Sequence, residues 1–296
     1  MTERCGYVAL LGRPNVGKST LLNHVLKQKL AITSRKPQTT RKTLLGIDTD
    51  PAANCQAIYV DTPGIHDHAH RALNKFMVSQ AVATLQDVDL RVLLIEAGRW
   101  TAGDEHVLNL LRESPGRNFA VLSKVDLLEN KETLLPAMQQ VGDTALFEEI
   151  VPLSALKNEG VEAFRQLVFG ALPDNPHLFA DDQITDQTER QIVAEMVREK
   201  VMRQLGDELP HSTGVVVEAF TEEPELVTIH ADIYVERQGQ KRIVIGQQGQ
   251  RLKSIGQEAR KDIEALLGIK VMLHLWVKVR KDWTNKASGL QRLGYE

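Results

Sequence analysis

The stretch from Gly12 to Ser19 reads Gly-Arg-Pro-Asn-Val-Gly-Lys-Ser and matches the pattern G-x-x-x-x-G-K-[ST]. It follows an apolar run at 7–11, which predicts a strand, and it opens a helical pattern at 18–26. Glycines let backbone amides converge on phosphate oxygens, and the N-terminus of the helix adds positive partial charge. In this motif Lys18 reaches the β- and γ-phosphates and the Ser19 hydroxyl ligates Mg²⁺. The stretch therefore predicts a nucleotide-binding P-loop.

Short apolar runs alternate with helical patterns on the C-terminal side of this loop. Strands are predicted at 43–47, 56–60, 90–95, 119–122 and 150–153, and helices at 104–112, 132–140 and 161–172. Strands that alternate with helices favour a mainly parallel sheet covered on both faces. The first 172 residues therefore predict an α/β P-loop domain.

Three further motifs follow predicted strands, at the sheet edge where open α/β sheets bind ligands. Asp61-Thr-Pro-Gly64 supplies a carboxylate for Mg²⁺ and a glycine amide for the γ-phosphate. Asp126, in Ser123-Lys-Val-Asp126, can accept both hydrogens on the guanine edge, and the Ser154-Ala155 backbone can donate to guanine O6. The motifs together favour GTP over ATP. The nucleotide-binding candidates are Gly12, Arg13, Pro14, Asn15, Val16, Gly17, Lys18, Ser19, Thr20, Asp61, Thr62, Pro63, Gly64, Ser123, Lys124, Asp126, Ser154 and Ala155.

A second domain is predicted at 187–296, after a linker at 173–186 that is rich in proline and acidic residues. A helix is expected at 189–205, strands at 214–220 and 226–235, a helix at 250–267 and a strand at 270–279. Gly246-Gln-Gln-Gly249 is expected to join an apolar strand to the helix that follows. This order matches the α+β layout of a type II KH domain, whose G-x-x-G loop clamps a nucleic-acid backbone.

Charge is divided unevenly along the chain. The net charge is −3, yet residues 237–292 hold 13 basic and 4 acidic residues, which indicates a polyanionic partner for the C-terminal domain. Trp283 lies among Lys278, Arg280, Lys281 and Lys286, a group that predicts either a patch tracking a single strand or a solvated basic surface. The RNA-binding candidates are Ile245, Gly246, Gln247, Gln248, Gly249, Arg251 and Lys253.

The whole chain resembles the bacterial Era GTPase family. The P-loop, Gln38-Thr-Thr-Arg41, Asp61-Thr-Pro-Gly64, Ile184-Thr-Asp186 and Val244-Ile-Gly-Gln-Gln-Gly249 carry the resemblance. It implies a Ras-like GTPase domain joined to a KH domain, GTP and GDP as nucleotides, binding near the 3′ end of 16S rRNA, and a role in maturation of the 30S ribosomal subunit. It also implies that Thr40 ligates Mg²⁺ beside Ser19 and Asp61, with Thr39 as a rival. Lys18, Asn15, Thr40 and Gly64 are the expected catalytic residues, and Asn15 is expected to help hold K⁺.

The sequence departs from the usual GTPase pattern at two positions. Ser123 stands where guanine-reading motifs generally begin with Asn, which ties that loop to the phosphate loop. Ile65 stands where Ras has a glutamine that orients the attacking water, so slow turnover is expected. Arg35 and Arg41 are interpreted as surface residues, and His66, His68 and His70 as polar residues of a loop rather than metal ligands.

The remaining features concern location and alternatives. Two cysteines make no disulfide framework, no stretch approaches the ~18 apolar residues of a membrane span, and the N-terminus lacks the form of a signal peptide. We expect a monomer in the cytoplasm, and peripheral contact with the inner membrane stays open. The alternatives are a tRNA-modification GTPase and a non-catalytic RNA-binding module with a vestigial nucleotide site.

Overall fold

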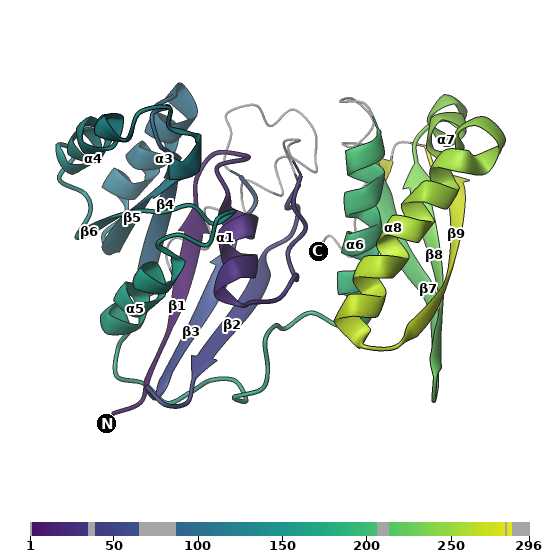
Figure 1. The fold of residues 1–296 in the computed structure, drawn as a ribbon, viewed down its shortest axis with the longest axis horizontal. Helices are drawn as coiled ribbons and strands as arrows, with labels where there is room; N and C mark the ends of the chain where they lie inside the picture. Colours follow the sequence, from purple (N-terminus) through teal and green to yellow (C-terminus); the bar gives the residue numbers. More distant parts are fainter. Residues whose placement is uncertain (1, 35–38, 65–86, 206–212, 282, 286–296) are drawn as a thin grey trace. The chain divides into compact units, whose positions relative to one another are not determined.

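The structure, a computed structural model, describes residues 2–34, 39–64, 87–205, 213–281 and 283–285. These residues belong to two units (Figure 1). The first holds the described residues through Ala31 and from Thr40 to Asp186. The second holds those from Gln187 onward, together with 32–34 and Thr39.

A six-stranded sheet forms the centre of the first unit, in the order β2-β3-β1-β4-β5-β6. Its strands are parallel except β2, which runs antiparallel to β3. The elements are β1 (Arg4–Leu11), α1 (Lys18–Val25), β2 (Leu44–Asp50), β3 (Cys55–Asp61), β4 (Leu90–Glu96), α3 (Ala102–Glu113), β5 (Arg117–Ser123), α4 (Leu134–Gly142), β6 (Glu149–Pro152) and α5 (Val161–Ala171). The predicted mainly parallel α/β fold is confirmed.

Alternate residues of each strand point to opposite faces of this sheet, and helices cover both faces. On one face Val8, Leu10 and Val92 pack with apolar side chains of α1 and α5. On the other face Ala9 and Leu93 pack with apolar side chains of α3 and α4. Because both faces are buried, the central strands read as continuous apolar runs in the sequence.

The segment 173–186, expected as a linker, makes ordered contacts with the first unit. The buried Gln56 side chain accepts from the amides of Leu178 and Phe179, at 2.9 and 3.0 Å, and donates to the Phe179 carbonyl. Further along, the Thr185 hydroxyl donates to the Leu45 carbonyl at 2.7 Å. These bonds fix the segment along β2 and β3.

The second unit is a three-stranded sheet with helices on one face (Figure 1). Strand β7 is antiparallel to β8, and β8 is parallel to β9. The elements are α6 (Glu189–Gln204), β7 (Gly214–Glu223), β8 (Leu226–Val235), α7 (Gln238–Ile245), α8 (Gln250–Leu267) and β9 (Lys270–Val279). The predicted α+β KH arrangement is confirmed.

Helix α6 buries more than the apolar face that the sequence predicts. Ile192, Met196 and Val201 are buried as expected, but so are Glu199 and Lys200. The Lys200 ammonium donates to Glu199 at 3.0 Å and also to Asp262 of α8. Buried charges are tolerated when they are paired in this way.

One predicted element is wrong. The residues before the G-x-x-G loop form a helix, α7, and not an apolar strand. Gln240 accepts from the amides of Glu236 and Arg237, which caps the start of this helix. Only Val244 of the apolar run at 243–245 is buried, so the run is one turn of an amphipathic helix.

No helix within the described residues is long and apolar enough to cross a membrane. Both cysteines, Cys5 and Cys55, are buried free thiols, as expected.

Candidate functional site

The phosphate loop connects β1 to α1 through backbone that favours glycine. Gly12 and Gly17 have φ of 140° and 110°. A Cβ on Gly12 would lie 2.6 Å from the Leu94 carbonyl oxygen, so only glycine fits there. Among the residues that the structure describes, no side chain caps the start of α1, which leaves its first amides for a ligand.

Lys18 is buried at the centre of this loop. Its ammonium donates to the carbonyl oxygens of Gly12, at 3.0 Å, and Arg13, at 3.3 Å. Burial lowers the pKa of Lys18 to about 8, although the Asp61 carboxylate opposes that shift. A buried ammonium whose described hydrogen-bond acceptors are two carbonyl oxygens is suited to receive a phosphate anion.

Ser19, Thr40 and Asp61 converge beside Lys18. The Asp61 Oδ2 accepts from Ser19 Oγ at 2.7 Å and from Thr40 Oγ1 at 3.3 Å, and the two hydroxyl oxygens are 2.9 Å apart. The other carboxylate oxygen, Asp61 Oδ1, is buried with no hydrogen-bond partner among the described residues. Burial raises the pKa of Asp61, against the lowering effect of Lys18 and the two hydroxyls. Three oxygen ligands and an unsatisfied carboxylate oxygen fit a hard cation such as Mg²⁺.

The structure treats the two rival threonines differently. Thr40 belongs to the first unit and joins this oxygen cluster. Thr39 belongs to the second unit, where its carbonyl accepts from the Arg198 guanidinium. Arg41, expected at the surface, is buried.

Gly64 lies against the phosphate loop. A Cβ at this position would be 2.8 Å from the Pro14 nitrogen, so the close approach requires glycine. The Thr62 hydroxyl donates to the Leu10 carbonyl at 2.8 Å and holds the start of this turn to β1. Ile65, His66, His68 and His70 lie outside the described residues. Within the described residues, no three or more His, Cys, Asp or Glu side chains form a group that could hold a metal ion.

Ser123 makes the connection to the phosphate loop that asparagine makes in the usual motif. Its hydroxyl is buried and donates to the carbonyl of Val16 in the phosphate loop at 2.7 Å, and it lies 3.2 Å from the Ile95 carbonyl. Asp126, three residues after Ser123, accepts from the Ser154 hydroxyl at 2.5 Å. The short side chain reaches the phosphate loop because β5 brings its backbone close to Val16.

Glu96, at the end of β4, is a residue that the sequence analysis missed. Its Oε2 accepts from Arg13 at 2.9 Å and from Lys124 at 3.1 Å, and so links the phosphate loop to the guanine motif. Burial raises the pKa of Glu96, but Lys124 and Arg13 outweigh it and the net shift is downward. Arg13 also donates to the buried Asp104 of α3 at 3.2 Å. The Arg13 side chain is thereby turned toward carboxylates, so a phosphate contact from this residue would come from its backbone.

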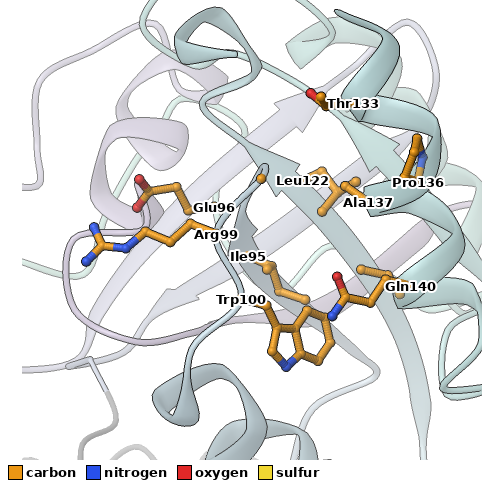
Figure 2. A pocket seen from close by; sticks show the side chains of 11 residues that line it. Ile95, Glu96, Arg99, Trp100, Leu122, Thr133, Pro136, Ala137 and Gln140 are labelled. Atoms are coloured by element: carbon orange, nitrogen blue, oxygen red, sulfur yellow. The ribbon is translucent and has the colours of Figure 1, made fainter. Parts of the chain in front are cut away.

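A pocket of about 350 Å³ lies next to Glu96, between β4, β5 and α4. Figure 2 shows Trp100 and Gln140 around it, with Leu122 and Ala137 from the apolar layer. None of the nucleotide-binding candidates lines this pocket. It is therefore separate from the predicted GTP site.

The G-x-x-G loop of the second unit joins α7 to α8. Gly246 and Gly249 have φ of 73° and 77°, and Gln248 also has a positive φ, 47°. Gln247, Gln248 and Lys253 are exposed, whereas Arg251 donates back to the Ile243 carbonyl at 2.7 Å. The loop presents its backbone and two neutral amides to solvent.

The predicted basic patch around Trp283 is wrong in its central residue. Trp283 is fully buried, so it is a core residue and not a stacking surface. Lys286 lies outside the described residues.

Together the P-loop, the oxygen cluster and the guanine loop define the class of this protein as a P-loop GTPase that carries a C-terminal KH unit. A family model described as 50S ribosome-binding GTPase matches residues 7–124, and a KH domain model matches residues 208–284. GTPase Era of Azotobacter vinelandii is 51% identical over 100% of this chain and 99% of its own length. GTPase Era of Marinobacter nauticus is 52% identical over 99% of this chain and 95% of its own. This chain belongs to the Era family of GTPases.

Solved structures support the same assignment. Era in complex with MgGDPNP and nucleotides 1506–1542 of 16S ribosomal RNA aligns with a TM-score of 0.94 at 37% identity, over 99% of both chains. A variant of Aquifex aeolicus Era bound to GDP and AlF4⁻ gives the same TM-score, identity and coverage. The similarity therefore includes both units.

Proposed function

We propose that this protein is a GTP-hydrolysing RNA-binding switch that binds 16S rRNA near its 3′ end and assists assembly of the 30S subunit. Its site is supported above all by the convergence of Ser19, Thr40 and Asp61 around an unsatisfied buried carboxylate oxygen. The relative solved with MgGDPNP and 16S rRNA supports the choice of nucleotide, metal and RNA.

The residues of the first unit divide the work of nucleotide binding. Lys18 and the amides at the start of α1 hold the phosphates, and Ser19, Thr40 and Asp61 hold Mg²⁺, which when bound neutralises phosphate charge. The Asp126 carboxylate accepts the guanine N1–H and amino hydrogens, and the Ser154-Ala155 backbone donates to O6. Adenine has no such donor pair on its edge, so this arrangement selects GTP.

Hydrolysis in this account is slow and stimulated by K⁺. Ile65 offers no hydrogen bond to a water, and Asn15, with φ of 66° in the phosphate loop, is the proposed contributor to a K⁺ site. Hydrolysis is measured in KCl and in NaCl at equal ionic strength. Equal rates in the two salts, unchanged in Asn15→Ala, would remove K⁺ from the proposal.

RNA binding is assigned to the second unit. Gly246 and Gly249 permit close approach of a sugar-phosphate backbone, and the exposed Gln247 and Gln248 stand at the tip. Ile245, Arg251 and Lys253 flank this contact. A tRNA-modification enzyme would need a further site for substrate chemistry, and a vestigial nucleotide site would not keep Lys18, Ser19, Asp61 and Asp126 together.

The central experiment for nucleotide binding uses Lys18→Ala. Charge-assisted hydrogen bonds contribute roughly 1.5–3 kcal/mol, so the GTP dissociation constant should rise about tenfold to a hundredfold. Fluorescent-nucleotide titration measures it, and circular dichroism checks the fold. An unchanged dissociation constant would overturn the site assignment.

We propose a cytoplasmic monomer, in keeping with two buried free thiols.

A further inference from the structure

The KH sheet has one face that no described helix covers. Helix α6 packs against β7 and α8 against β9, on the face that carries the buried odd-numbered residues of β8, such as Ile229 and Ile233. The even-numbered residues of β8 and β9 point to the opposite, open face because side chains alternate along a strand. On β9 the open face presents Met272, His274, Trp276 and Lys278, all exposed.

Three flat rings gather on this open face, and we call them the ring cluster: His230, His274 and Trp276. The parallel register pairs His230 of β8 directly with His274 of β9, and their ring centroids are 4.8 Å apart. The Trp276 ring stacks with His230 at 5.2 Å, with 14° between the planes, and with His274 at 5.8 Å. Trp276 is 45% exposed, so part of this stacked surface is open to solvent.

Two carboxylates of this face accept hydrogen bonds from neighbouring side chains, and Glu223 of β7, which pairs with Leu226, is a third, exposed carboxylate at its end. Asp232 is buried and accepts from Lys278 of β9 and from the Tyr234 hydroxyl. Glu218 of β7 also accepts from the Tyr234 hydroxyl, at 3.1 Å. Because Lys278 is paired with Asp232, the exposed groups that β9 offers to a ligand on this face are the ring faces and Lys270 at the start of the strand.

Charge favours a polyanion over an apolar partner. The stretch 270–281 contains four basic residues and no acidic residue, and Met272 is the one exposed aliphatic side chain on the open face of β9. Stacked rings beside basic residues are how sequence-tolerant single-strand binders hold bases, and a sheet with exposed rings can stack two or three bases.

We propose that the open face of the KH sheet is a second RNA-binding surface, on which the ring cluster stacks bases of single-stranded RNA. It is distinct from the G-x-x-G loop, which lies at the junction of α7 and α8. The choice of RNA as the ligand class rests on the RNA-binding function proposed above. Two contacts in one unit would hold two segments of the same RNA.

The test uses the full chain with the loop weakened by Gln247→Asp and Gln248→Asp. In this background labelled oligo(A) should still bind and should quench tryptophan emission. Adding Trp276→Leu should weaken oligo(A) about tenfold, which is about 1.4 kcal/mol and within the range for one stacked base. Trp276→Phe should keep most of the affinity because it keeps a ring. The matched control, Met272→Ala, lies on the same face with similar exposure and should change nothing.

Three results would overturn the proposal. One is equal oligo(A) affinity with and without Trp276→Leu, in proteins whose circular dichroism and GTP binding are unchanged. Another is loss of all oligo(A) binding in the loop-weakened background. The third is a change in self-association, measured by sedimentation, when Trp276→Leu leaves RNA affinity unchanged. That result would make the open face a protein interface. If Gln247→Asp and Gln248→Asp do not weaken RNA binding, the assignment of the G-x-x-G loop is contradicted instead. The comparison of proteins with and without Trp276→Leu would still decide the present proposal.

Discussion

The two units build their sites in opposite ways. The first places buried charged and hydroxyl groups at the ends of parallel strands, and Lys18, Asp61 and Ser123 are all buried there. The second presents exposed backbone and neutral amides at a glycine loop between two helices. A buried polar site depends on particular atoms, whereas an exposed backbone site depends on access and charge. Substitutions should therefore act sharply in the first unit and more gradually in the second.

The largest effect is expected at Asp126. Asp126→Asn removes the charged acceptor for guanine, and its amide can donate to the extra carbonyl of xanthine. Affinity for GTP should fall by about a hundredfold or more, since losing a designed polar contact costs several kcal/mol, and affinity for XTP should rise. Competition titration with GTP, XTP and ATP measures the change. A variant that still prefers GTP would remove Asp126 from base recognition.

The loop of the second unit should respond to added negative charge. Gln247→Asp with Gln248→Asp places two carboxylates against phosphate, so RNA affinity should fall roughly tenfold, by a similar factor for matched and scrambled sequences, because phosphate contacts position without reading sequence. Filter binding on both RNAs measures this. The exposed pair Gln238→Asp and Gly239→Asp, at the other end of α7, is the control for added charge alone. Equal losses in both pairs would show that the loop has no special role.

The buried Lys18 predicts a pH dependence confined to the nucleotide site. Its pKa in the folded protein is about 8, below the ordinary value of 10.5, so the ammonium loses its proton as pH rises through about 8. GTP affinity should therefore fall between about pH 7 and pH 9. Without nucleotide, Lys18 is protonated in the unfolded chain but largely deprotonated in the folded protein between about pH 8 and pH 10.5. Its contribution to the free energy of unfolding should therefore rise with pH in this window. Lys18→Arg, which stays charged, should flatten the affinity profile, and a profile identical to the wild type would contradict this account.

The smallest effect is expected at Glu96, which acts through Lys124 and Arg13. Glu96→Gln keeps the size of the side chain but weakens both ion pairs, so GTP affinity should drop severalfold, in line with roughly 1 kcal/mol for partly exposed pairs. Glu105→Gln is the control, because its ion pair with Arg112 is exposed in the same unit. Glu96→Asp should recover little, since the shorter chain cannot reach both cations. If Glu96→Gln and Glu105→Gln behave alike, Glu96 does not position the guanine motif.

The sequence predicts different parts of the two units, and the difference has physical reasons. The phosphate loop was predicted because its function depends on residue types within eight consecutive positions. The role of Ser123 was not, because its acceptor, the Val16 carbonyl, is 107 positions away in the chain. Glu96 was missed for the same reason, since Arg13 and Lys124 approach it only through the fold.

In the second unit, the wrong predictions came from local sequence patterns that are compatible with two different structures. The apolar run at 243–245 is compatible with a strand or one helical turn, and the cap formed by Gln240 decides for the helix. Trp283 among basic residues is compatible with a surface patch or a core residue. Burial against the rest of the unit, which no local pattern specifies, makes it a core residue.

The central claim, that the buried site of the first unit selects guanine, is tested most directly by the affinities of the unmodified full chain for GTP and for ATP. Calorimetry in buffer with Mg²⁺, repeated after addition of EDTA, measures both. We expect GTP to bind at least about a hundredfold more tightly than ATP. EDTA should weaken GTP binding, because the oxygen cluster of Ser19, Thr40 and Asp61 needs its cation. Equal affinities for GTP and ATP, or GTP binding that is indifferent to EDTA, would contradict it.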